Sequence, residues 1–144
     1  MDEVEIIWLS DRTASVLNSV AEGVFDEAVR PDQTAAFIAE PSHHMAVAVV
    51  DGFVVGMISA VRYLHPDKAP SLWINEVGVG DAWLRRGIAK RLMGVMLDKS
   101  EALGCEAAWL GTEPDNGPAL ALYRSVSGKE ESGVWFAWDT EPDP

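Results

Sequence analysis

The 144-residue sequence contains one cysteine, few basic residues and no long apolar run. A single cysteine cannot form a disulfide within the chain, and no Cys/His spacing typical of a zinc site accompanies it. No apolar run is long enough for a membrane span, and the acidic start MDEVEIIWLS does not resemble a secretory signal. We therefore expect a cytoplasmic protein that holds no metal.

Basic residues are scarce: 11 Lys and Arg face 23 Asp and Glu, which gives a formal net charge of -12. This charge repels phosphate backbones, so nucleic acid and anionic membranes are poor candidates for the main partner, and a small cationic molecule is a better one. The basic residues are also unevenly spread, because Arg85, Arg86, Lys90, Arg91 and Lys99 fall in one short stretch. That stretch indicates a local anion site.

The length and composition favour one folded domain over residues 1–144. Apolar residues make up 48% of the chain and charged residues 24%, as in soluble globular proteins. Residues 1–40 are expected to hold a first strand and helices. The pattern predicts a strand at 4–9, a helix after Ser10 or Asp11 that carries Val16 to Val24, and a helix at 31–40 that begins with proline.

Alternating strands and helices are predicted in the rest of the chain. Two apolar runs, 45–50 and 53–64, flank Asp51-Gly52, which predicts a tight hairpin. Further elements follow in order: a strand at 72–79, a helix at 87–103, a short buried strand at 107–111, a helix at 118–126 and a closing strand at 133–139.

The segment NEVGVGDAWLRRGIAKRLM, residues 75–93, changes from an extended run to a helix near Gly87. Such a turn points unpaired backbone N–H groups and the positive end of the helix dipole at one spot, where phosphate binds well. Gly87 allows close backbone approach, and Arg85, Arg86 and Lys90 add positive charge. The alternative is a solvated basic turn with no ligand.

The segment DNGPALALY, residues 115–123, has the features of a capped helix. Asn116 suits the cap, Pro118 suits the first turn, and Ala119 and Tyr123 share one helix face. By itself, the segment indicates a helix that buries a tyrosine.

Together these two segments resemble the coenzyme A motifs of the GNAT superfamily of N-acetyltransferases. The first motif, Gln/Arg-x-x-Gly-x-Gly/Ala, is matched by residues 84–89, although Leu84 stands at the polar first position. The second, Asn-x-x-Ala-x-x-Leu-Tyr, is matched at every fixed position by residues 116–123; where the family often has Gly four residues later, this chain has Ser127. The resemblance covers about residues 45–139, the expected coenzyme-binding core. It implies a single GNAT-like domain of the α/β (α+β) class, with a mixed central sheet, splayed fourth and fifth strands and about four flanking helices.

The resemblance implies that acetyl-coenzyme A is the acyl donor. Backbone groups of Val77 and Val79 would pair with the pantetheine arm, Asn116 and Ala119 would line it, and amides of the basic turn would hold the pyrophosphate. The expected coenzyme-binding residues are Val77, Gly78, Val79, Leu84, Arg85, Arg86, Gly87, Ile88, Ala89, Lys90, Asn116, Ala119 and Tyr123.

The resemblance also implies direct transfer of the acetyl group to an amine in a ternary complex. Glu76 is expected to accept a proton from the amine, directly or through water, and Tyr123 to protonate the departing thiolate. The amide of Val77 or Val79 is the expected oxyanion donor. Cys105 is the alternative nucleophile, but its place between a helix and a buried strand favours a core residue.

Several segments are similar to the aminoglycoside 3-N-acetyltransferases: EGVFDEAV, QTAAFIAEP, AVAVVDGFVVGMISA, YLHPDKAP and LGTEPDNGPALALY. This likeness and the acidic charge both favour a small cationic acceptor. The residues expected on the acceptor side are Glu22, Asp26, Glu27, Trp73 and Glu113.

Two alternatives stay open at this point. The acceptor could be a polyamine, an amino sugar or a protein amine. The chain could also be a coenzyme A-binding module without catalysis, and the sequence leaves a homodimer open.

Overall fold

The computed structural model describes residues 3–140 and contains one five-stranded sheet with the order β1-β2-β3-β4-β5. The strands are β1 (Glu5–Trp8), β2 (His43–Val50), β3 (Phe53–His65), β4 (Lys68–Val79) and β5 (Ala107–Trp109). The pairings from β1 to β4 are antiparallel, and β5 joins β4 in parallel. The mixed sheet expected from the sequence is therefore confirmed.

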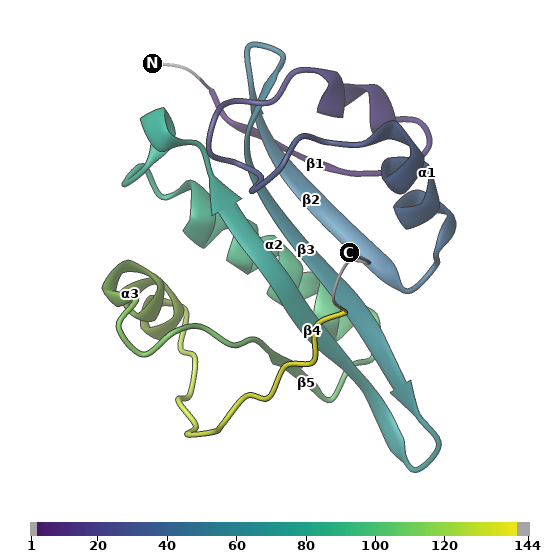
Figure 1. The fold of residues 1–144 in the computed structure, drawn as a ribbon, viewed down its shortest axis with the longest axis vertical. Coiled ribbons are helices and arrows are strands. Elements are labelled where there is room, and N and C mark those ends of the chain that lie inside the picture. The colour runs from purple at the N-terminus through teal and green to yellow at the C-terminus, as the bar shows by residue number, and fades with distance from the viewer. Residues whose placement is uncertain (1–2, 141–144) are drawn as a thin grey trace.

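In the part of the chain that the structure describes, three α-helices and two short 3₁₀ helices accompany the sheet: η1 (Ala14–Asn18), α1 (Pro31–Ala39), η2 (Asp81–Trp83), α2 (Ile88–Ala102) and α3 (Gly117–Ser125). Figure 1 shows α2 running across the sheet and α1, with the rest of the N-terminal segment, near β1 and β2. A separate cluster of buried residues lies on each face of the sheet. The sheet is thus the middle layer of one domain.

The larger core lies between the sheet and α2. Leu92 and Met96 of α2 are fully buried against Ile58 of β3 and Leu72 of β4. Each such side chain contributes about 2 kcal/mol through the removal of apolar surface from water. This packing fixes α2, and with it the turn that precedes the helix, relative to β4.

The second core lies under the N-terminal segment. Val24 and Leu17 pack there against Met45, Val47 and Met57 of β2 and β3. The loop that carries Val24 passes so close to β4 that a Cβ atom on Gly78 would lie 2.2 Å from the Val24 carbonyl oxygen. Gly78 therefore sets how closely residues 20–29 approach the sheet.

The local signals of the sequence are confirmed where a turn or cap determines the structure. Asp51 and Gly52 both have positive φ values, 49° and 81°, as a tight hairpin turn requires. The helix expected at 31–40 is α1, with Pro31 in its first turn. Ser127, which stands where the related motif often has glycine, adopts a left-handed φ of 66° just after α3.

The helix predicted after Ser10 or Asp11, through Val24, is wrong: a single short 3₁₀ helix forms in this segment. Residues 14–18 form η1, but the chain then runs beside β3, where the Ala21 amide donates to the Val54 carbonyl and the Val54 amide donates to the Ser19 carbonyl, each at 2.8 Å. Gly23, with a φ of 91°, turns the chain back. Pairing with a distant strand has replaced the helical hydrogen bonds that the local spacing favoured.

Near the C-terminus one strand prediction is wrong and another is confirmed only in part. Residues 133–139 form no strand, and Val134, Trp135, Phe136 and Trp138 are exposed. The strand expected to be buried at 107–111 is the three-residue β5, and Trp109 within it is exposed. Apolar residues alternate in residues 133–139, but no strand edge in the described part of the chain pairs with this segment.

Substituting Gly78→Ala is expected to lower the free energy of unfolding by about 1–3 kcal/mol, because the added methyl group collides with the Val24 backbone. Urea unfolding followed by circular dichroism measures this loss. Gly94→Ala is the matched control, because a Cβ there meets nothing within 4 Å and alanine favours a helix. Equal unfolding midpoints for Gly78→Ala and the native protein would contradict the close approach.

Candidate active site

β4 and β5, the last two strands of the sheet, part early and leave one edge of β4 open. Their pairing ends at Trp73 and Trp109, whereas β4 continues to Val79. Beyond Trp73, β4 keeps its hydrogen-bonded neighbour β3 on one side. Its other edge is available to a ligand that pairs with it as a strand does.

The register shows which backbone groups face this open edge. The Gly80 amide donates to the Val55 carbonyl of β3 at 2.8 Å, and antiparallel pairs alternate between hydrogen-bonded and non-hydrogen-bonded residues. Counting back along β4, the backbone groups of Gly78 face β3, and those of Val77 and Val79 face the open edge. The side chains of Val77 and Val79 pack on the α2 core.

A turn that suits an anion follows this edge directly. Gly87 occupies the N-cap of α2 with a φ of 78°, and no side chain caps the helix. The first amides of α2 therefore lack a capping acceptor, and the positive end of the helix dipole lies there. Arg85 also has a positive φ, 61°, which is uncommon for a residue with a side chain.

The basic stretch divides into two groups. Arg91 donates to the Val4 carbonyl at 3.1 Å, and the Lys99 ammonium lies 5.1 Å from the centre of the Trp8 ring. These two cations hold the first strand. Arg85 and Lys90 are exposed around the turn, and Arg86 is exposed there too, with its guanidinium 4.8 Å from the centre of the Trp83 ring.

Helix α3 lies beyond β5. The Asn116 side chain accepts a hydrogen bond from the Ala119 amide at 3.2 Å, so the cap predicted from the sequence is confirmed. Tyr123 is half-buried against the α2 core, and burial raises the pKa of its hydroxyl above the ordinary 10.0. The hydroxyl is therefore protonated at neutral pH and can donate a hydrogen bond or a proton.

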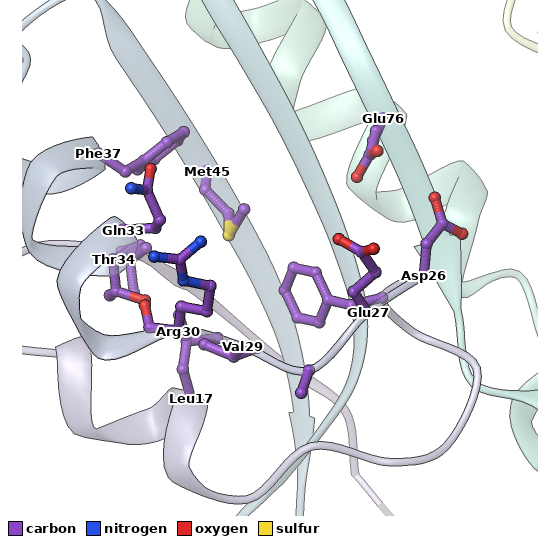
Figure 2. Close-up of a pocket in the computed structure, with 13 residues that line it drawn as sticks. Leu17, Asp26, Glu27, Val29, Arg30, Gln33, Thr34, Phe37, Met45 and Glu76 are labelled. Atoms are coloured by element: carbon purple, nitrogen blue, oxygen red, sulfur yellow. The ribbon is translucent and has the colours of Figure 1, made fainter. Parts of the chain in front are cut away.

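A pocket of about 300 Å³ lies on the other face of the sheet, between the N-terminal segment and β4. Figure 2 shows the carboxylates of Asp26, Glu27 and Glu76 at one side of this pocket. Its opposite side combines the apolar side chains of Phe37 and Met45 with polar side chains from the start of α1 and the residue before it: Arg30, Gln33 and Thr34. Such a pocket suits an amine that is carried on a partly apolar body.

Glu76 has a perturbed carboxyl group. Partial burial raises the pKa of Glu76, and the nearby negative charge of Asp26 raises it further. A higher pKa makes the carboxylate a stronger base, so Glu76 is better suited to accept a proton than an ordinary surface glutamate.

Comparison with known proteins identifies the family that has this arrangement. Residues 7–128 match the model of the acetyltransferase (GNAT) family. The chain belongs to the GNAT family. The match includes the open strand edge, the turn before α2 and the capped helix α3.

Two curated relatives share part of the sequence. The chain is 30% identical over 81 residues to an L-2,4-diaminobutyric acid acetyltransferase of Nocardia farcinica, a stretch that covers 56% of this chain and 41% of the relative. It is 34% identical over 99 residues to the N-alpha-acetyltransferase RimI of Mycobacterium tuberculosis, covering 67% and 60% respectively. The matched stretches thus span less than two thirds of either relative.

Solved structures share the fold over nearly the whole chain. An aminoglycoside acetyltransferase from an uncultured soil metagenomic sample, in complex with sisomicin, has a TM-score of 0.80 at 17% identity and covers 96% of this chain and 97% of its own. Aminoglycoside N-acetyltransferase AAC(6')-Iy in complex with CoA has a TM-score of 0.76 at 18% identity, with 96% of each chain covered. The likeness to aminoglycoside acetyltransferases is confirmed at the level of fold, with an AAC(6') enzyme in place of the expected 3-N group.

The GNAT fold brings the expected coenzyme residues to one side of the molecule. Val77 to Val79 form the end of the open edge, and Leu84 to Lys90 form the turn and the start of α2. Leu84 is exposed, so the position that is polar in the family motif carries an apolar side chain in solvent. The roles of these residues stay predictions, as do those of Asn116 and Ala119.

Of the five residues expected to line the acceptor side, two line the pocket and three do not. Asp26 and Glu27 line the pocket with Glu76, whereas Glu22, Trp73 and Glu113 are not among its described lining residues. Other residues of the N-terminal segment line the pocket but were not predicted from the sequence to do so: Phe25, Val29, Arg30, Gln33, Thr34 and Phe37. The proline at the start of α1 predicted the helix that carries three of these residues, Gln33, Thr34 and Phe37.

Other reactive side chains lie apart from this site. Cys105 packs on the α2 core, in agreement with a structural role. His43 faces Phe37 with ring centres 5.2 Å apart, while burial lowers the pKa of His44, with Lys99 as the next cause. Within residues 3–140, no group of three His, Cys, Asp or Glu residues could hold a metal ion, and no helix has the length and apolarity to cross a membrane.

Replacing Gly87→Val is expected to weaken acetyl-coenzyme A binding by more than about tenfold, because a side chain would occupy the space next to the helix amides. Both this site and Gly104 have a left-handed φ, 78° and 75°, and neither has an atom within 4 Å of an added Cβ. Gly104→Val is thus a matched control that carries the same backbone strain, about 1–2 kcal/mol.

Isothermal titration calorimetry with acetyl-coenzyme A measures both variants. Loss of binding in Gly87→Val, with binding kept in Gly104→Val, is the expected result. Equal affinity in the two variants would mean that the turn has a structural role alone.

Proposed function

We propose that the protein transfers the acetyl group of acetyl-coenzyme A to a primary amine of a small cationic acceptor. One observation carries the proposal: a single strand, β4, has two backbone amides facing an open edge and carries the Glu76 carboxylate, which lines the pocket. Membership of the GNAT family supports this use of the strand. The donor and the acceptor would approach β4 from different sides.

The coenzyme would lie along the open edge of β4. Val77 and Val79 would pair with its amide groups, and the first turn of α2 would hold its pyrophosphate, with Arg85 and Lys90 nearby. A solved structure of the same fold contains CoA, which supports coenzyme A as the ligand.

The transfer itself needs one base, one oxyanion donor and one acid. Glu76 accepts the proton of the amine, directly or through water, as the nitrogen attacks the acetyl carbonyl carbon and the new C–N bond forms. The Val77 or Val79 amide donates to the oxygen that gains negative charge. The C–S bond then breaks, and Tyr123 donates a proton to the thiolate. No covalent acetyl-enzyme is required.

A cationic acceptor is supported by charge. The pocket has three carboxylates on one side, and the protein has a net charge of -12. An aminoglycoside is one such acceptor, and the neighbour whose structure contains sisomicin makes it the first compound class to assay.

A second candidate is an amine of an amino acid or the α-amine of a protein. It is favoured by the two curated relatives, which are named as an L-2,4-diaminobutyric acid acetyltransferase and an N-alpha-acetyltransferase. Thiol release from acetyl-coenzyme A across aminoglycosides, polyamines, diamino acids and N-terminal peptides distinguishes the candidates. Absence of thiol release with every acceptor, despite coenzyme binding, would favour a non-catalytic module.

Tyr123→Phe is expected to lower kcat about a hundredfold and to leave the KM for acetyl-coenzyme A nearly unchanged, because the ring still packs and the proton donor alone is lost. Steady-state thiol-release assays give both constants. The chain has one other tyrosine, Tyr63, which is exposed on β3, so Tyr63→Phe is the matched control. Native kcat in Tyr123→Phe would remove the hydroxyl from the mechanism.

The pH dependence of kcat is expected to show the raised pKa of Glu76. The base works when it is deprotonated, so kcat rises with pH through the pKa of Glu76 on the acidic side of the profile. Asp26→Asn removes a negative charge that raises this pKa, so the acidic limb should move to lower pH.

Glu27→Gln is the control for the pH experiment. Glu27 lines the same pocket but is not among the causes that raise the Glu76 pKa. The acidic limb of the kcat profile of Glu27→Gln should therefore keep its native position, even if the acceptor KM changes. An acidic limb that stays in place in Asp26→Asn, or that persists in Glu76→Gln, would show that another group is the base.

A further inference from the structure

Three tryptophans from three separate parts of the chain meet on the sheet. The rings of Trp73 in β4 and Trp109 in β5 have centres 4.2 Å apart, and Trp135 from the C-terminal segment lies 6.1 Å from Trp73. The three rings, which we call the tryptophan cluster, are tilted by 52° and 49°. In Figure 1 the yellow C-terminal segment, which contains Trp135, runs beside β5.

The cluster faces solvent. Trp109 is 46% exposed and Trp135 is 69% exposed. The Trp73 ring is held in place by a hydrogen bond that its Nε1 donates to the Asn75 side chain at 3.2 Å. Large aromatic surface that is ordered but exposed in this way is typical of a binding site.

The tryptophan cluster lies on the acceptor face of β4. Residues that are directly opposite in neighbouring strands share a face, and Trp73 pairs with Val61 as Glu76 pairs with Ser59. A bulge at Asn75 keeps Trp73 and Glu76 on the same side although three positions separate them. At the usual rise of a strand, that separation is about 10 Å.

The other tryptophans indicate what these rings bind. The Arg86 guanidinium lies 4.8 Å from the centre of the Trp83 ring, and the Lys99 ammonium lies 5.1 Å from that of Trp8. The tryptophan cluster has no such cation from within residues 3–140. Exposed indole faces attract cations, and the carboxylates of the neighbouring pocket strengthen the attraction.

We propose that the tryptophan cluster binds a second cationic group of the acceptor, about 10 Å from the amine that is acetylated at Glu76. The acceptor is then a long diamine or a larger polycation with two charged ends. This inference rests on the proposed function, because it takes Glu76 as the place of the reacting amine. It adds a length requirement that the pocket carboxylates alone do not impose.

The test compares acceptors that differ in the remote group. Diaminooctane carries a cation at the far end, aminooctanol has the same length with a neutral end, and diaminopropane is too short to reach the cluster. The expected result is a kcat/KM about tenfold higher for diaminooctane than for aminooctanol in the native protein. Equal values for these two acceptors would overturn the proposal.

Variants then assign the preference to the cluster. Trp109→Ala and Trp135→Ala should each reduce the diaminooctane preference severalfold and leave kcat/KM for diaminopropane at the native value. Trp135 lies in a segment without strand pairing, so its replacement carries little risk to the fold. Trp138→Ala is the matched control, since Trp138 is 88% exposed and lies outside the cluster. An unchanged preference in both cluster variants, or an equal loss in Trp138→Ala, would contradict the proposal.

A binding measurement separates this inference from the proposed function. Diaminooctane methylated to a bis-quaternary ion cannot be acetylated, and its binding by calorimetry does not depend on catalysis. Binding that weakens severalfold in Trp109→Ala supports the cluster even if no acceptor is turned over. If Trp135→Ala changes the sedimentation coefficient but not this binding, the cluster is a contact between copies of the chain and the proposal is wrong.

Discussion

β5 pairs with β4 over three residues, and because the pairing ends there, the rest of β4 has an open edge on which the candidate site depends. A sheet edge exposes N–H and C=O groups that must find partners, and here the edge lies in the middle of the molecule between β4 and the chain that leaves β5. A ligand with its own amide groups can satisfy the edge. β3 pairs with β4 on the opposite edge, and the side chains of Val77 and Val79 pack on the α2 core, so the position of the open edge is fixed by both contacts.

The bulge at Asn75 and the absence of a side chain at Gly78 place the acidic pocket and the open edge on the same strand. Because of the bulge, Glu76 faces the pocket while the backbone groups of Val77 face the open edge, so the proposed base and the proposed oxyanion donor are neighbours in sequence. Gly78 lets the N-terminal loop come close enough to place Asp26 beside Glu76. The raised pKa of Glu76, the direction of the Val77 backbone groups and the close approach of the N-terminal loop therefore depend on residues 75–78.

Features determined by local chemistry could be predicted from the sequence: the Asp51-Gly52 hairpin, the proline start of α1 and the Asn116 cap. Features that depend on distant partners could not. The spacing of Val16 to Val24 favoured a helix, but pairing with Val54 drew the chain along β3. Asp26 and Glu76 were both expected at the site, whereas their mutual effect on pKa and the meeting of three tryptophans follow from tertiary structure.

Amide hydrogen exchange at single-residue resolution tests the central claim most directly. The amides of Val77 and Val79 face the open edge of β4 and should exchange rapidly in the free protein, whereas the Gly78 amide faces β3 and should be protected. Saturating acetyl-coenzyme A should slow exchange at Val77 and Val79 and leave Gly78 unchanged. Unaltered exchange at Val77 and Val79, with the coenzyme shown by calorimetry to be bound, would contradict the account.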